Sequence, residues 1–193
     1  MNEITGQTSI TINVPIQAAY DYLADFTRHP EWVKNVFRVM PFQKGNTGVG
    51  AKFRTMEFTP PTTIGRAIAA TLQYTLGVFK GVAPMSICEI TALESPHRIA
   101  WVGYLPQGKS LPQGKGGEFN RAEWEFELVA QGNDTQVIQR FRYLPQTSGA
   151  RKMIAALGDG RGIAASCAAS LKKLKRVLEQ QVVPGMARSA VAL

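Results

Sequence analysis

Two segments in the second half of the chain alternate polar and apolar residues, and this alternation constrains the fold more than any other feature. They are residues 118–130 and 135–143, separated by the turn-forming sequence Gln131-Gly132-Asn133-Asp134. Successive side chains of a strand point to opposite faces of the sheet, so a period of two over such lengths is typical of half-buried strands. Two such runs on either side of a glycine-containing turn predict an antiparallel hairpin.

The same alternation predicts which face of the hairpin is buried. Glu123, Glu125 and Glu127 share one face of the first strand, and burying three unpaired carboxylates would be very costly. The opposite face therefore points inward. Arg140 and Arg142 of the second strand then lie opposite the glutamates on the outside, where we expect structural ion pairs across the hairpin. The inward residues are Ala122, Trp124, Phe126, Leu128, Val137, Gln139, Phe141 and Tyr143.

Further strands are predicted before this hairpin, and one long helix after it. The strand segments are rich in β-branched and aromatic residues and are separated by glycine- or proline-containing turns; they are residues 8–14, 36–42, 51–58, 85–93 and 98–104. A helix is expected from Ile16 to Asp25, followed by a short helical turn near Pro30. From about 149 to 181 apolar residues recur every three or four positions, which indicates a long amphipathic helix with one buried face.

The order of these elements indicates the fold class. Strand and helix do not alternate along the chain, which argues against a doubly wound nucleotide-binding sheet. We expect an α+β fold in which a curved antiparallel β-sheet is wrapped around a long C-terminal α-helix, because one helix then covers the apolar face of every strand. Residues 1–181 form a single domain in this interpretation, and residues 182–193 form a flexible tail.

The sequence lacks the usual signatures of metal, disulfide and cofactor sites. Cys88 and Cys167 lie far apart, without the spacing of a metal site, and a chain of 193 residues can form a sufficient core without cross-links. No phosphate-binding or dinucleotide-binding motif is present, so we expect no cofactor. No apolar run approaches the ~18–20 residues of a membrane span, and the first residues do not resemble a signal peptide. We therefore expect a cytoplasmic protein with reduced thiols.

Basic residues are in excess, 22 against 14 acidic ones, for a formal net charge of +8. The excess is concentrated between Arg140 and Arg176, where Asp159 is the single acid. Three interpretations fit this pattern: a solvated helix surface, which is the default, contact with an anionic membrane surface, and binding of nucleic acid, the least favoured. The basic residues that lie off the apolar stripe of the last helix are Lys172, Lys173, Lys175 and Arg176.

Short motifs along the chain resemble those of a known superfamily. They are Val14-Pro15 leading into Tyr20-Asp21-Tyr22-Leu23-Ala24-Asp25-Phe26, His29-Pro30-Glu31-Trp32, Gly48-Val49-Gly50-Ala51-Lys52-Phe53, Glu94-Ser95-Pro96-His97-Arg98-Ile99-Ala100-Trp101, the 118–143 hairpin and Leu171-Lys172-Lys173-Leu174. Their order and spacing over residues 4–180 resemble the START-like (SRPBCC) superfamily and, more narrowly, its polyketide cyclase/dehydrase and lipid-transport family. The resemblance implies a helix-grip fold with an internal hydrophobic cavity between the sheet and the last helix.

The resemblance also implies a function. Members of this family bind or transform lipids, sterols, quinones and aromatic polyketides, so we expect binding of a hydrophobic small molecule by a carrier or sequestering protein. The alternative is a cofactor-independent cyclase or dehydratase, in which Gln139, Tyr143 or Asn120 would polarise a substrate carbonyl. Apolar pockets with a few convergent polar groups are the usual form of such sites. The residues expected to line the cavity are Ile99, Trp101, Asn120, Trp124, Phe126, Gln139, Phe141, Tyr143, Met153 and Leu157.

No residue is assigned a catalytic role. His29 and His97 lack a neighbouring nucleophile or acid pattern that would favour a catalytic base. Asp25 is expected to cap the turn that follows it. Cys167 lies on the apolar stripe of the last helix and is expected to behave as a small hydrophobic residue.

Two segments depart from the family pattern. Residues 59–83 form an insertion whose only charges are Arg66 and Lys80 and whose apolar residues recur at helical spacing. An exposed apolar helix would form an adhesive patch, so we expect a lid over the cavity, a contact between copies of the chain, or an element that touches a membrane. The second segment, residues 105–117, is a loop rich in glycine, lysine and proline, and its role stays open.

Overall fold

A computed structural model of the chain describes residues 3–34, 36–43, 45–57, 85–104, 121–145, 148, 151, 152, 155 and 159–186. Several predicted features lie outside these residues: the 59–83 lid, the 105–117 loop, Asn120, Met153, Leu157 and residues 187–193 of the predicted tail.

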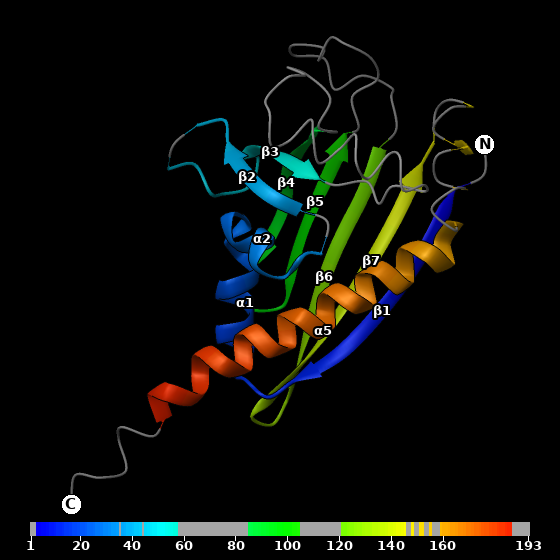
Figure 1. Ribbon diagram of the computed structural model, residues 1–193. Coiled ribbons are helices and arrows are strands. Elements are labelled where there is room, and N and C mark those ends of the chain that lie inside the picture. The colour runs from blue at the N-terminus through cyan, green and yellow to red at the C-terminus, as the bar shows by residue number, and fades with distance from the viewer. Residues whose placement is uncertain are drawn as a thin grey trace, which may run out of the picture.

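The described strands form one antiparallel sheet of seven strands in the order β1-β7-β6-β5-β4-β3-β2. From β2 to β7 each strand pairs with the next along the chain, and β1 lies beside β7 (Figure 1). The strands are β1 (Ile4–Ile12), β2 (Val36–Pro41), β3 (Lys52–Glu57), β4 (Met85–Glu94), β5 (Arg98–Tyr104), β6 (Arg121–Gln131) and β7 (Asp134–Leu144).

The helices pack against one face of this sheet, called the inner face from here on. They are α1 (Ile16–Ala24), the 3-10 turn η1 (Phe26–Arg28), α2 (His29–Trp32) and α5 (Asp159–Met186). Figure 1 shows α5 running diagonally across the sheet in front of β1 and β7, with α1 and α2 on the same side near β4 and β5. The opposite, outer face of the sheet carries no helix among the described elements.

These elements confirm the predicted α+β helix-grip architecture. The 118–143 hairpin is present as β6 and β7, with Trp124 opposite Phe141 and Gln131 opposite Asp134. The last helix, α5, runs from Asp159 to Met186, past the predicted end at 181, and residues 151, 152 and 155 before it are also helical. It begins close to β1: a Cβ atom at Gly160 would lie 3.1 Å from the carbonyl oxygen of Thr5.

The core lies between the inner face and the helices, as the alternation predicts. On α5, Leu171, Leu174 and Leu178 are buried, whereas Lys172 and Lys173 are exposed, so the predicted apolar stripe is confirmed. The sheet supplies the facing residues Ile12, Ile90, Ile99, Phe126, Leu128 and Val137, all buried in the same hydrophobic cluster. None of the helices in the described ranges is both long enough and apolar enough to cross a bilayer.

Candidate functional site

Aromatic rings form a continuous row across the inner face of the sheet. The indole rings of Trp101 on β5 and Trp124 on β6 are stacked, with centroids 6.1 Å apart and planes 9° from parallel. The Phe126 ring lies 5.3 Å from Trp101, and the Phe141 ring lies 6.0 Å from Trp124. These residues come from neighbouring strands at matching register, so the sheet itself fixes the spacing of the row.

One end of the row reaches the beginning of α5. Tyr143 on β7 lies 5.6 Å from Trp124, and both side chains are only half-buried. The Phe141 ring lies over Gly6 of β1, where a Cβ atom would overlap it, so only glycine leaves room for this ring. Phe141 also packs against Ile163 and Cys167 of α5.

The other end of the row contains four residues that the sequence analysis did not assign to the site. The Phe26 ring lies 4.6 Å from Phe53 on β3 and 5.3 Å from Trp101. The His29 ring lies 5.7 Å from Trp101, and the Trp32 ring lies 5.8 Å from Phe126. A signal for two of them was present: His29 and Trp32 are three residues apart, which places both on one face of a helical turn.

Ion pairs and caps on the solvent side of η1 and α2 direct His29 and Trp32 inward. Arg28 and Glu31 are also three residues apart, and they form a salt bridge of 3.0 Å on the exposed side. Burial raises the pKa of Tyr22, and the hydrogen bond that its hydroxyl donates to Glu31 at 2.8 Å raises it further. Asp25 accepts from the backbone N–H of Thr27 and caps η1, as predicted.

His29 is buried, with 4% of its surface exposed. Burial in this aromatic surrounding lowers its pKa from 6.5 to about 3, because the charged imidazolium would lose its hydration. Asp25 acts in the opposite direction but is the weaker influence. The imidazole is therefore neutral at physiological pH, and the inner face keeps its uncharged character here.

Three buried polar atoms on the inner face have no hydrogen-bond partner within the described part of the chain. They are His29 Nε2, Trp32 Nε1 and Gln139 Oε1. Trp32 and Gln139 are 1% and 6% exposed, so water does not reach these atoms freely. Gln139 on β7 lies directly opposite Phe126 on β6, the Phe126 ring contacts Trp32, and the His29 ring lies 5.2 Å from the Trp32 ring.

The described members of the predicted site all contribute to the inner face. Ile99, Phe126, Gln139, Phe141 and Trp101 are buried there, and Trp124 and Tyr143 are half-buried. Asn120, Met153 and Leu157 lie outside the described residues. Together these side chains form a largely buried apolar layer on the inner face, with three polar atoms that have no partner among the described residues.

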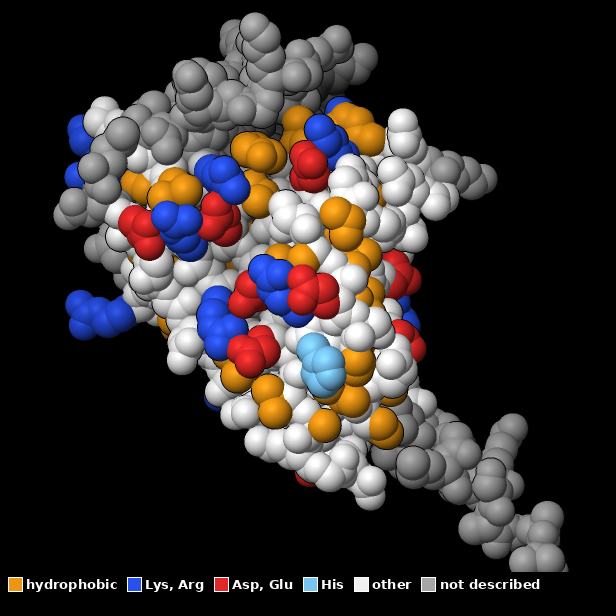
Figure 2. Space-filling model, turned by 180° about the vertical axis from the view of Figure 1, so that it is seen from behind, with side chains coloured by type: hydrophobic (Ala, Val, Ile, Leu, Met, Phe, Trp, Pro, Cys, Tyr) orange, Lys and Arg blue, Asp and Glu red, His pale blue; other side chains and the backbone are white. Residues whose placement is uncertain are grey.

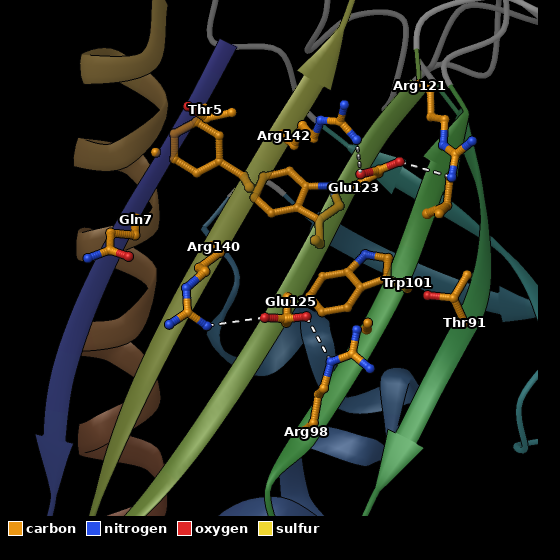
Figure 3. A pocket seen from close by; sticks show the side chains of 15 residues that line it. Thr5, Gln7, Thr91, Arg98, Trp101, Arg121, Glu123, Glu125, Arg140 and Arg142 are labelled. Carbon is orange, nitrogen blue, oxygen red and sulfur yellow. Dashed lines mark hydrogen bonds and ion pairs between the residues drawn. The ribbon is translucent and has the colours of Figure 1, made fainter. Parts of the chain in front are cut away.

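The outer face has a different character. Figure 2 shows basic and acidic side chains interleaved across it. An open hollow of about 660 Å³ lies among them, and Figure 3 shows Arg98 and Arg140 converging on Glu125 within it. Its lining residues are Thr5, Gly6, Gln7, Thr91, Arg98, Ala100, Trp101, Val102, Arg121, Glu123, Trp124, Glu125, Arg140, Phe141 and Arg142.

Each arginine of this hollow is paired with a carboxylate. Arg98 lies 2.8 Å from Glu125 and Arg140 lies 3.1 Å from the same residue. Arg142 bridges Glu123 and Glu3, and Arg121 bridges Glu123. The predicted ion pairs across the hairpin are therefore confirmed. The carboxylates offset the charge of the arginines, and exposed pairs of this kind add little to stability.

The remaining residues considered for catalysis or metal binding are His97, Cys167 and the acidic side chains. His97 is exposed. Cys167 is buried, and burial raises the pKa of its thiol to about 11, so it is protonated and unreactive. No group of three or more His, Cys, Asp or Glu side chains that could hold a metal ion exists within the described ranges.

Residues 3–179 match the family described as polyketide cyclase / dehydrase and lipid transport. The chain belongs to this family. The match spans β1 through most of α5 and therefore includes every described residue of the inner face. No curated protein matches the chain.

Several solved structures share the fold. The Zhui aromatase/cyclase from a Streptomyces species superposes with a TM-score of 0.63 over 100% of both chains at 12% identity. A START superfamily protein from Mycobacterium smegmatis has a TM-score of 0.58 at 14% identity, over 92% of this chain and 99% of that one. The di-domain StfQ of the steffimycin biosynthetic pathway has a TM-score of 0.60 at 13% identity, over 93% of this chain and 52% of that one. At these identities the likeness concerns the fold alone.

Proposed function

We propose that this protein binds a hydrophobic small molecule, such as a lipid, a quinone or a polyketide-like compound, between the inner face of its sheet and α5, as a carrier or sequestering protein. The observation that carries the proposal is the row of aromatic rings from Phe53 to Tyr143. Aromatic side chains provide large apolar contact areas, and stacked or edge-on ring pairs add to the binding of flat molecules. Membership of the family and the Zhui-like fold support the same proposal.

The half-buried end of the row is the proposed entrance. Trp124 and Tyr143 lie there, beside the first turns of α5, whereas Phe126 at the other end is fully buried. A ligand entering at Trp124 would first contact a stacked indole pair and then reach the deeper rings. This places Trp124 at the entrance of the proposed site.

Replacing Trp124 by alanine is expected to weaken binding of the neutral fluorescent probe N-phenyl-1-naphthylamine by about tenfold or more, because the stacked partner of Trp101 is removed. Fluorescence titration measures the change. Tyr104→Ala is the matched control. Tyr104 is the last residue of β5 and, three positions after Trp101, points to the opposite, outer face of the sheet. This variant should bind the probe as the wild type does. Equal binding by wild type and Trp124→Ala would contradict the proposed site, and no binding by the wild type would contradict the function.

An enzyme of the cyclase or dehydratase kind is the second candidate. The buried indole N–H of Trp32, which has no hydrogen-bond partner among the described residues, favours it, because a donor in an apolar surrounding can polarise a substrate carbonyl. Native mass spectrometry of the purified protein, followed by solvent extraction, separates the two candidates. A co-purifying ligand that stays unchanged on incubation supports a carrier, whereas a cyclised or dehydrated product supports the enzyme.

We also propose that α5 contacts an anionic membrane surface, from which a hydrophobic ligand would be taken. Arg161, Lys172, Lys173 and Arg176 are exposed on α5 and form no ion pair with the described residues, in contrast to the paired arginines of the outer face. They extend over about 22 Å of helix at 1.5 Å per residue. Each cation near an anionic bilayer contributes about 1 kcal/mol of attraction.

The protein is therefore expected to sediment with vesicles of phosphatidylcholine and phosphatidylglycerol at low salt, and not with phosphatidylcholine alone. The double variant Lys172→Glu/Lys173→Glu should lose at least about tenfold in vesicle affinity, and high salt should abolish binding. Equal association with both vesicle types would contradict the proposal. Binding to duplex DNA without binding to vesicles would instead identify nucleic acid as the partner of this face.

A further inference from the structure

The unpartnered polar atoms of the inner face are concentrated at one place, whereas other buried polar side chains are satisfied. Thr135 donates to the carbonyl of Val14 at 2.7 Å, and Ser170 donates to the carbonyl of Ser166 at 3.1 Å. Three of the four unpartnered atoms belong to neighbouring side chains: Trp32 contacts Phe126, Gln139 lies opposite Phe126 in register, and the His29 ring lies 5.2 Å from the Trp32 ring. The fourth, Arg54 Nε, belongs to a side chain whose guanidinium lies over Phe42 on β2–β3, away from this group.

Such atoms are rare in native proteins, because a buried donor or acceptor without a partner loses its hydration and gains nothing in return. An occupant that supplies the missing partners would recover this loss. The Trp32 indole N–H is a donor and needs an acceptor, while Gln139 Oε1 is an acceptor and needs a donor. A single hydroxyl group can do both, because its oxygen accepts a hydrogen bond and its O–H donates one.

The charge of the surroundings restricts the occupant further. The rings in contact with Phe126 and Trp32 include those of Trp101 and His29, and Gln139 lies opposite Phe126; none of these side chains carries a charge at physiological pH. A carboxylate placed there would be buried without a counter-ion, and it could not donate to Gln139 Oε1. The surroundings therefore favour a neutral group over an anionic one.

We infer that Trp32, Gln139 and His29 form a hydrogen-bonding subsite for an uncharged hydroxyl group of the ligand, and that this subsite discriminates against carboxylates. The inference rests on the proposed function, since it requires that a ligand enters the inner face. The aromatic row holds the apolar body of the ligand, and the subsite at the deep end determines its orientation. His29 Nε2 can donate a hydrogen bond to the hydroxyl oxygen or accept one from the hydroxyl hydrogen, because a neutral imidazole nitrogen donates or accepts according to its tautomer.

Three probes of one shape test the inference: naphthalene, 2-naphthol and 2-naphthoate. Equilibrium dialysis against the full chain at near-neutral pH should show 2-naphthol binding about tenfold or more tightly than either of the others. In Gln139→Met, which keeps the length of the side chain and removes its amide, the preference for 2-naphthol over naphthalene should largely disappear while naphthalene binding persists.

Gln136→Met is the matched control. Gln136 is on the same strand, β7, but points to the outer face, where it accepts from Gln131. This variant should keep the wild-type preference. Trp32→Phe provides a second test of the same subsite, because it removes the indole N–H and keeps a smaller aromatic ring next to Phe126.

The outcomes are distinguishable. Equal binding of naphthalene and 2-naphthol to the wild type, or an unchanged preference in Gln139→Met, would overturn the subsite and leave the proposed function intact. Tighter binding of 2-naphthoate would overturn the preference for a neutral ligand. If no probe of the three binds, the proposed function fails together with the inference. If Gln139→Met does not fold, the affinities of the wild type and of Trp32→Phe for 2-naphthol and naphthalene still test the subsite. An unchanged preference in Trp32→Phe would then overturn it.

Discussion

Replacing Phe126 by alanine is expected to lower the free energy of unfolding by about 3–5 kcal/mol, the usual cost of removing a large buried ring. Phe126 is 0% exposed and packs β6 against α2 and β5, since its ring contacts Trp32 and Trp101. The surrounding rings are held by different elements, so they cannot collapse easily into the space left. Denaturant unfolding followed by circular dichroism measures the change, and the melting temperature should fall by roughly 10 °C.

Phe42→Ala is the matched control for this prediction. Phe42 follows β2 and is 50% exposed, so its removal takes little apolar surface out of the interior. Its effect on the free energy of unfolding should stay well below that of Phe126→Ala. Similar effects of the two substitutions would contradict the assignment of Phe126 to the centre of the core.

The β6–β7 hairpin and its inner face could be predicted from the sequence because a single alternating pattern determines both. In β6 the three glutamates exclude one face from the interior, and the antiparallel register then assigns Gln139 and Phe141 of β7 to the inner side. The ion pairs of Arg140 with Glu125 and of Arg142 with Glu123 confirm this reasoning. The stripe of leucines on α5 was predictable for the same reason, since periodicity identifies the face of a helix that must be buried.

Half of the candidate site could not be predicted in this way. Phe26, His29 and Trp32 belong to elements too short for a periodic pattern, and a three-residue turn followed by a single helical turn gives little indication of its direction. Their contacts with Trp101 and Phe126 arise only when α2 packs against β2 and α5. The spacing of His29 and Trp32 was a usable signal, but an isolated histidine next to an aromatic residue is more often part of a core.

The unpartnered atoms of Gln139, Trp32 and His29 were also beyond the reach of sequence reasoning. A pattern predicts that a side chain points inward, but not whether its polar atom finds a partner there. Gln139 and Thr135 are both buried polar residues of β7, yet Thr135 donates to Val14 and Gln139 Oε1 has no partner in the described part of the chain. Only the arrangement of neighbouring side chains separates a satisfied core residue from one available to a ligand.

His29 should also make the stability of the fold depend on pH. Burial lowers its pKa from 6.5 to about 3, so the native state keeps the imidazole neutral while the unfolded chain takes up a proton below pH 6.5. The stabilisation from the neutral form is thus fully present above pH 6.5 and is lost progressively as the pH falls toward 3. Between pH 6.5 and about 4.8 the free energy of unfolding should decrease by about 2 kcal/mol through this residue.

His29→Phe is expected to remove this pH dependence, because it keeps a planar ring against Phe26 and Trp101 and eliminates the titrating group. The chosen window avoids the other contributor near the site: the hydrogen bond from Arg28 lowers the pKa of Glu31 below 4.5, so the stabilisation from that carboxylate is lost only at lower pH. Chemical unfolding at a series of pH values measures the slope. His97→Gln, which replaces the exposed histidine, should retain the full slope, since His29 remains in place. A slope that survives in His29→Phe would show that the buried imidazole is not its source, and the neutral inner face on which the proposed ligand preference depends would need another explanation.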